Sequence, residues 1–90
     1  MEEEIGEVKK EEVGKVTHFY PKINVAVVDL KAPLRVGDRI LIKGSVTNFE
    51  QTVESMQIEH QNIEEADAGQ SIGLKVIERA RENDVVYKLL

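Results

Sequence analysis

Short apolar segments separated by turn residues run along most of this chain. Residues 39–43 alternate, with Ile40 and Ile42 on one face and two basic side chains on the other, which is typical of a half-buried strand. Residues 23–30 are apolar on both faces apart from Asn24 and Asp29, which indicates a strand buried on both sides or closed into a barrel. The same reasoning predicts strands at 13–20, 71–77 and 85–90. Several short strands with turns between them point to an all-β barrel.

The segment 50–60 fits two structures equally well on its local pattern. A helix would place positions 49, 53, 56, 60 and 63 on one apolar stripe. A strand would alternate, with Met56 and Ile58 on one face. The strand requires a bulge or bend near residues 54–55, because Val53 has the opposite parity to Met56.

Turn signals separate the predicted strands. Pro21 ends the first strand, because proline has no N–H group to give to a ladder. Residues 62–70 read as a turn-rich connection, and residues 78–84 are charged and irregular, with room for one helical turn. Gly73 inside the strand predicted at 71–77 indicates a close backbone approach or a kink.

The length of 90 residues fits one domain. Residues 1–12 consist largely of Glu and Lys, so they predict an acidic flexible tail, and residues 13–90 hold the predicted barrel. The formal net charge of −5 is a poor basis for non-specific nucleic acid binding, which depends on Lys and Arg neutralising phosphates. The absence of cysteine excludes disulfides and thiolate sites.

No stretch of the sequence predicts a membrane span or a secretory signal. The longest apolar run, residues 25–28, is far too short to cross a bilayer. The acidic start of the chain is the opposite of a basic signal-peptide region. We therefore expect a cytoplasmic protein.

The residues that could carry chemistry do not form a catalytic pattern. The two histidines, His18 and His60, lack a carboxylate at a metal-ligand spacing, so we expect strand histidines and no metal site. The acidic residues at 64, 65 and 67 fall in a turn, where side chains point into solvent. No serine stands in a nucleophile motif. We expect no enzyme activity, no cofactor and no bound nucleotide.

One basic cluster is the candidate for a partner or RNA-backbone patch. Its predicted members are Lys22, Arg35, Arg39 and Lys43. Arg39 and Lys43 share a strand face, and Arg35 lies in the turn before that strand. The alternative interpretation is a charged barrel exterior that protects strand edges and keeps the protein in solution.

Three ordered motifs resemble the second domain of elongation factor Tu and related translation GTPases. They are LRVGDRILIKG (34–44), TVESMQ (52–57) and IEEADAGQSIGL (63–74). The segments VTHFYPK (16–22) and FEQTVESMQ (49–57) also resemble stand-alone proteins labelled translation elongation factor-like, and the C-terminal barrel of collagenase-like peptidases. The resemblance implies a small closed antiparallel β-barrel of about six strands, and it favours the strand over the helix at 50–60.

The same resemblance bears on function. The chain has no G-x-x-x-x-G-K-[ST] loop, so it holds no GTPase site. The family's transfer-RNA-binding glutamate and a turn asparagine align with Gln57 and Ser71, so the RNA site is not carried over residue by residue. We expect a non-enzymatic module that docks on a protein partner in translation or RNA modification. The alternative is an accessory module that binds transfer RNA or the ribosome through Arg35, Arg39 and Lys43.

Overall fold

A computed structural model describes residues 9–90, and this part of the chain is built from ten β-strands without a helix. The prediction of an all-β protein is therefore confirmed. The strands are β1 (Lys10–Tyr20), β2 (Val25–Leu30), β3 (Leu34–Arg35), β4 (Arg39–Lys43), β5 (Asn48–Thr52), β6 (Met56–Ile58), β7 (Gln61–Ile63), β8 (Glu65–Ala66), β9 (Ser71–Lys75) and β10 (Val85–Leu89).

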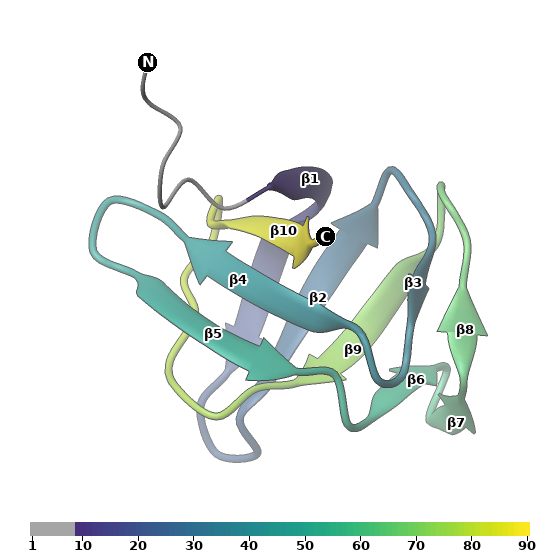
Figure 1. Ribbon diagram of the computed structural model, residues 1–90. Coiled ribbons are helices and arrows are strands. Elements are labelled where there is room, and N and C mark those ends of the chain that lie inside the picture. The colour runs from purple at the N-terminus through teal and green to yellow at the C-terminus, as the bar shows by residue number, and fades with distance from the viewer. Residues whose placement is uncertain (1–8) are drawn as a thin grey trace.

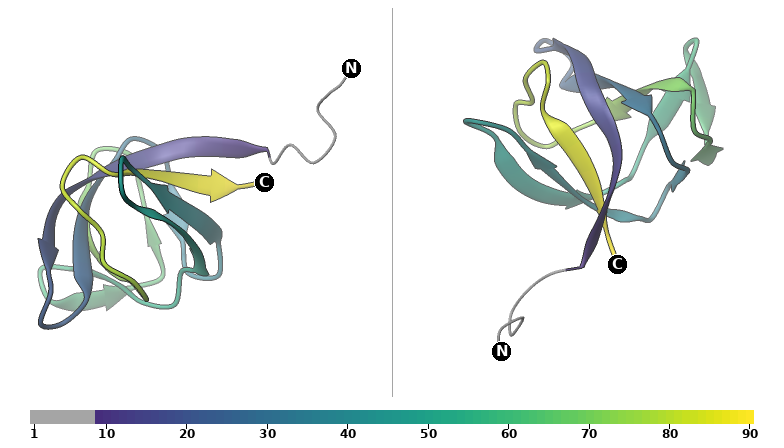
Figure 2. Two further views of the ribbon diagram at one scale, coloured as in Figure 1. Left: turned by 90° about the vertical axis from the view of Figure 1, so that its left-hand side faces the viewer. Right: turned by 90° about the horizontal axis from the view of Figure 1, so that it is seen from above.

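Eight strands form one sheet in the order β5-β4-β10-β1-β2-β9-β6-β7, and β3 pairs with β8 beside it (Figure 1). All pairings are antiparallel. The first part of β1 pairs with β10 and its later part pairs with β2. Figure 2 shows how the sheet curls around the space that its inner face encloses.

Two irregularities in β1 allow this curl. The register shifts between Glu12 and Gly14 against β10, and again between Val16 and His18 against β2. A β-bulge bends its strand and increases the local twist. The bends turn Val13 and Val16 into the interior, where both are fully buried, so one long strand serves two neighbours on a curved sheet.

The core follows the alternation of the strands. Ile40 and Ile42 of β4 and Ile72 and Leu74 of β9 are buried, as their sequence pattern predicts. Aliphatic side chains supply nearly all of this core, and Phe49 is its only buried aromatic residue within the part of the chain that the structure covers.

The prediction of a closed barrel of about six strands is overstated. The sheet ends at β5 on one side and at β7 on the other, and no strand ladder joins these ends within residues 9–90. The side-chain amide of Gln51 instead links β5 to the segment that leaves β9. Its Nε2 donates to the Lys75 carbonyl at 2.9 Å, and its Oε1 accepts from the Ile77 N–H at 2.8 Å. Gln51 is only 5% exposed, so its side-chain amide is largely shielded from water.

The segment 50–60 is extended, which confirms the strand and excludes the helix. Strand β5 ends at Thr52 and β6 begins at Met56, so the chain bends at the predicted place. Val53 and Met56 are both buried despite their opposite parity. Val53 is held by the turn before β4, because its N–H donates to Asp38 and its carbonyl accepts from Gly37, both at 2.8 Å.

The structure also contains strands that the sequence pattern did not indicate. Strands β7 and β8 lie in the region predicted as a turn-rich connection, and β3 lies in the predicted lead-in to β4. Strand β1 begins at Lys10, so residues 10–12 of the predicted tail pair with β10. Residues 1–8 of that tail lie outside the described part of the chain.

The irregular segment 78–84 is anchored by Asp84. Its Oδ2 accepts from the Arg81 N–H at 2.8 Å, and its backbone carbonyl accepts from the Val16 N–H at 2.8 Å. The buried Asp84 side chain lies directly against Gly44, where a Cβ atom would stand 1.8 Å from Asp84 Oδ1. The Asp84 contacts fix the link between β9 and β10 over one end of the sheet.

Gln51→Leu should lower the free energy of unfolding by about 1–3 kcal/mol, because it removes both hydrogen bonds of a buried amide and leaves the Lys75 carbonyl and the Ile77 N–H without their Gln51 partner. Gln57→Leu is the matched control. Gln57 is exposed and bonds only Asn62 among residues 9–90, so its replacement should change stability by less than about 0.5 kcal/mol. Urea unfolding of both variants measures the difference. Equal effects would show that the Gln51 amide does not hold β5 to the segment that leaves β9, a junction that we call the seam.

Candidate binding surfaces

The structure brings two of the four predicted patch residues together. Arg39 and Lys43 lie at opposite ends of β4 on its outer face, and both are exposed. Arg39 is engaged with β5, where Nη1 donates to Thr52 Oγ1 at 3.3 Å and Nη2 lies 3.6 Å from Glu50 Oε1. An exposed ion pair of this kind contributes little to stability, but it reduces the positive charge that this face offers.

Arg35 and Lys22 lie on elements other than β4. Arg35 is on β3, in register with Glu65 of β8, and its N–H donates to Asp38 Oδ2 at 2.9 Å. Lys22 is exposed in the turn between β1 and β2, and the sheet places β10 and β1 between β2 and β4. The four residues therefore form no single patch. Arg39 and Lys43 remain a pair on one strand.

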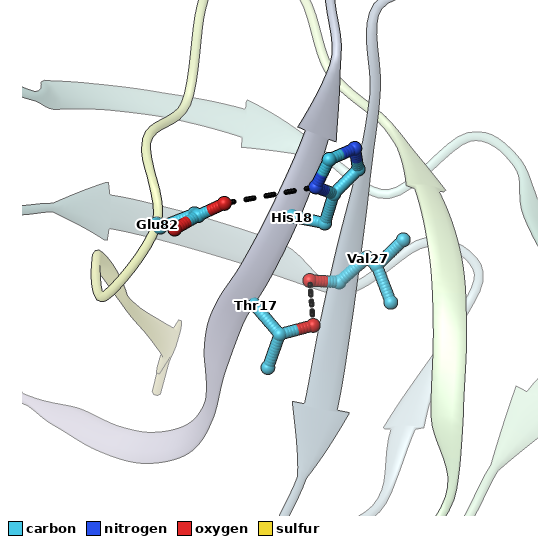
Figure 3. Close-up of polar contacts among 4 residues, drawn as sticks. All are labelled: Thr17, His18, Val27 and Glu82. Atoms are coloured by element: carbon cyan, nitrogen blue, oxygen red, sulfur yellow. Dashed lines mark hydrogen bonds and ion pairs between the residues drawn. The ribbon is translucent and has the colours of Figure 1, made fainter.

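The histidines do not build a metal site. His18 Nδ1 lies 3.6 Å from Glu82 Oε2 (Figure 3). The His18 ring also packs edge-on against Tyr20, with ring centroids 4.4 Å apart. Within residues 9–90, no group of three or more His, Cys, Asp and Glu residues is arranged to hold a metal ion.

A groove runs over Gly73 on the outer face of β2, β9 and β6. Two overlapping hollows, each of about 400 Å³, share Ile23, Val25, Gln57 and Gly73 in their lining. We call their union the Gly73 groove; its lining is Tyr20, Ile23, Val25, Val27, Ser55, Gln57, Glu59, His60, Gly73 and Lys75.

The floor of the Gly73 groove results from a missing side chain. Gly73 lies in register with Val27 of β2 on one side and Gln57 of β6 on the other. Both neighbours carry side chains on the same outer face, so the glycine leaves a depression between them. A Cβ atom at this position would stand 3.3 Å from Val25 Cγ1, which accords with the close approach predicted from the sequence.

The rim of the Gly73 groove is apolar on one side and polar on the other. Tyr20 is 48% exposed and Ile23 is 54% exposed, and both flank the turn between β1 and β2. Lys75 Nζ donates to the Ile23 carbonyl at 2.8 Å, which fixes this turn against β9. On the opposite side, Gln57 Nε2 donates to Asn62 Oδ1 at 3.0 Å.

The turn that closes the polar side is strained. Glu59 and His60 join β6 to β7 and have φ angles of 52° and 67°. A two-residue hairpin loop of this geometry favours Asn-Gly, because most side-chain-bearing residues resist positive φ, with Asn, Asp and His resisting it least. Strain of this kind is kept where the surrounding structure or a function requires the side chains.

A third hollow, of about 320 Å³, lies where segment 78–84 meets the end of β1. Its lining includes Phe19, Pro21, Arg79 and Arg81. Neither arginine forms an ion pair with another described residue. The sequence reasoning missed both this hollow and the Gly73 groove. The available signals were two exposed apolar residues on either side of Pro21 and a glycine inside a strand.

Comparison with known proteins agrees with one of the resemblances. No family model matches the chain. It is 44% identical over 82 residues to an uncharacterized protease of Methanocaldococcus jannaschii, covering 90% of this chain and 20% of that protein. It is 34% identical over 82 residues to a collagenase of Porphyromonas gingivalis, covering 89% of this chain and 23% of that protein. The chain thus spans about a fifth of the length of these relatives.

Solved structures show the same fold. Two structures of the C-terminal domain of a Geobacillus thermoleovorans protein described as a U32 peptidase superpose on the chain. One has a TM-score of 0.81 at 25% identity and covers 87% of this chain and 91% of that domain. The selenomethionine form has a TM-score of 0.80 at 24% identity, with coverage of 84% and 96%.

These matches confirm the likeness to the C-terminal domain of collagenase-like peptidases. The likeness to elongation factor Tu stays a prediction. The chain therefore corresponds to one domain of larger relatives. Residues 9–90 contain no helix that is long and apolar enough to span a membrane, and the cytoplasmic location stays a prediction.

Replacing the turn residues by Glu59→Asn and His60→Gly together should stabilise the protein by about 1–2 kcal/mol, because Asn tolerates positive φ better than Glu does and Gly has no Cβ atom to clash. Asn83→Gly is the control, since Asn83 also has a positive φ, of 76°, but asparagine tolerates it. Thermal unfolding would measure both changes. A loss of stability in the double variant would mean that the two side chains support the fold.

Proposed function

We propose that the chain is a non-enzymatic binding module that docks on a protein partner. The observation that carries this proposal is the Gly73 groove, which combines an apolar floor and rim with polar groups and lies on the outside of a complete core. Concave, mostly apolar surfaces with a few placed polar groups are typical of binding sites. Among residues 9–90, no group of three or more His, Cys, Asp and Glu residues could hold a metal ion, and the proposal assigns no catalytic role to the chain.

The partner belongs, in this proposal, to translation or RNA modification. The sequence motifs that resemble translation-factor barrels support that class. The relatives named protease and collagenase supply a second source of partners, because the corresponding domain there belongs to a much longer protein. Docking on a separately folded catalytic domain would reproduce in two molecules an arrangement that those relatives have in one.

Affinity capture with the full chain tests docking. At near-physiological salt we expect one protein to be recovered reproducibly and to capture the chain when the tag is placed on the partner instead. Its identity distinguishes a translation or RNA-modification enzyme from a peptidase. Ile77→Ser is the control variant and should capture the same protein as the unaltered chain. Ile77 is an exposed apolar residue outside both hollows of the groove. Recovery of no specific protein in either direction would overturn the proposal.

RNA binding is the second candidate function, and the exposed pair of Arg39 and Lys43 on one strand face favours it. The contact of Arg39 with Glu50 and the net charge of −5 weigh against it. Phosphate binding would make affinity fall with salt, because each neutralised phosphate releases counterions.

Binding of a labelled transfer RNA at about 50 and 200 mM salt measures this dependence. If the face binds RNA, changing Arg35, Arg39 and Lys43 to Glu should abolish binding at both salt concentrations, whereas Glu78→Gln, a change remote from β4, should not weaken it. No binding at low salt, or binding that the triple variant retains, would exclude this face as an RNA site.

A further inference from the structure

We propose that the Gly73 groove binds an extended peptide segment of the partner, with an apolar side chain over Gly73, a basic group toward Glu59 and an acidic group toward Lys75. This inference rests on the proposed docking function and names the chemistry of what docks. It follows from the shape of the groove, its charges and its strained border.

The shape favours an extended chain. The two hollows overlap along β9, one reaching the turn at Glu59 and His60 and the other reaching Ser55 and Lys75. Such a groove follows the strand direction between β2 and β6 instead of forming a single round cavity. An extended peptide suits such a groove, because its alternate side chains point to the same side and can all face the sheet.

The depth of the groove at Gly73 sets the apolar contact. Val25 and Val27 form the wall on the β2 side, and Ile23 and Tyr20 extend that wall above the sheet surface. An apolar side chain seated here would remove these exposed groups from water, which is the main favourable term in such contacts. Gln57 Oε1 accepts no hydrogen bond from another described residue, so it is available to a peptide N–H.

The charges favour a peptide over a nucleic acid. The groove has an acid at one end, Glu59, and a lysine at the other, Lys75. A polyphosphate backbone would meet one lysine and be repelled by the glutamate. A peptide carrying opposite charges at matching positions complements both ends.

The turn of Glu59 and His60 supports a binding role for the end of the groove that it forms. Glu59 and His60 hold positive φ angles where Asn-Gly would be less strained. Their side chains line the groove, and the structure shows no ion pair or hydrogen bond from either side chain to another residue within 9–90. A ligand contact accounts for keeping these residue types in this turn.

A library of random heptapeptides displayed on phage, selected on the full chain, provides the probe. Selected sequences should carry apolar residues at alternate positions, a Lys or Arg near one end and an Asp or Glu near the other. Anisotropy with a selected peptide then gives its affinity. Ile23→Ser should weaken binding about tenfold or more, while Ile77→Ser, a similarly exposed isoleucine outside the groove, should leave it unchanged.

The charge arrangement is tested by selection on Glu59→Lys. Enriched peptides should now carry an acidic residue where the original set carries a basic one, and Glu78→Lys should leave the original preference intact. A purely structural role for Glu59 would not reverse a preference in the ligand. Gly73→Leu should abolish binding in a protein that retains its cooperative unfolding, and Ile23→Ser covers the case in which this variant does not fold.

Several results would overturn the inference. They are the absence of enriched peptides, equal effects of Ile23→Ser and Ile77→Ser, and displacement of the selected peptide by adenosine monophosphate, which would make the groove a nucleotide site. If Ile23→Ser and Gly73→Leu still capture the same partner protein, the partner docks elsewhere and only the assignment of the groove fails. Docking itself fails when the unaltered chain captures no partner.

Discussion

The buried amide of Gln51 holds together a sheet that its strand ladders leave open. Strand β5 is one end of the eight-stranded order, and the chain that leaves β9 passes beside it without a ladder. Two hydrogen bonds to the segment that leaves β9 satisfy the amide of Gln51, which is buried and would otherwise be unpaired. Only a side chain with both a donor and an acceptor can make these two bonds. The seam therefore depends strongly on the residue type at position 51, whereas the strand ladders use backbone groups that nearly every residue carries.

The seam also positions the binding surface. Lys75, whose carbonyl accepts from Gln51, presents its ammonium group to the Ile23 carbonyl on the outer face. The Lys75 N–H donates to the Ser55 carbonyl at 3.2 Å, at the bend between β5 and β6. Lys75 therefore connects the Gln51 hydrogen bonds with the turn between β1 and β2 at the groove rim. This turn is held in place without any ligand. A preorganised rim lowers the entropy that binding must overcome.

Much of the fold follows from the sequence because alternation is a local signal. Ile40 and Ile42, and likewise Ile72 and Leu74, are buried where the period of two places them. The segment 50–60 was ambiguous because the bend after Thr52 breaks that period, and only the shared motifs favoured the strand. Strands β3 and β8 escaped prediction since two residues are too short to show a period, and their pairing joins positions far apart in the chain.

The candidate site was harder to predict for a physical reason. Basic residues can be read from the sequence, but whether they lie together depends on the strand order. The sheet places β10 between β4 and β1, the strand that leads into the Lys22 turn. The Gly73 groove arises from the register of β2, β9 and β6, which aligns a glycine between Val27 and Gln57. A local sequence pattern cannot predict this alignment, because the three residues lie on strands that are far apart in the chain.

The mixture of acidic and basic side chains on the surface limits which kinds of ligand it can attract. Nucleic acid binding requires a continuous basic surface, yet Arg39 is engaged with Glu50 and Lys31 lies 3.1 Å from Glu12. Acidic residues stand next to basic ones on several strands of the described chain, so long-range attraction of a polyanion is weak at physiological salt. Contacts that operate at short range, through apolar area and single hydrogen bonds, are not weakened in this way. These mixed charges support the proposal that a protein segment, and not a phosphate backbone, occupies the groove.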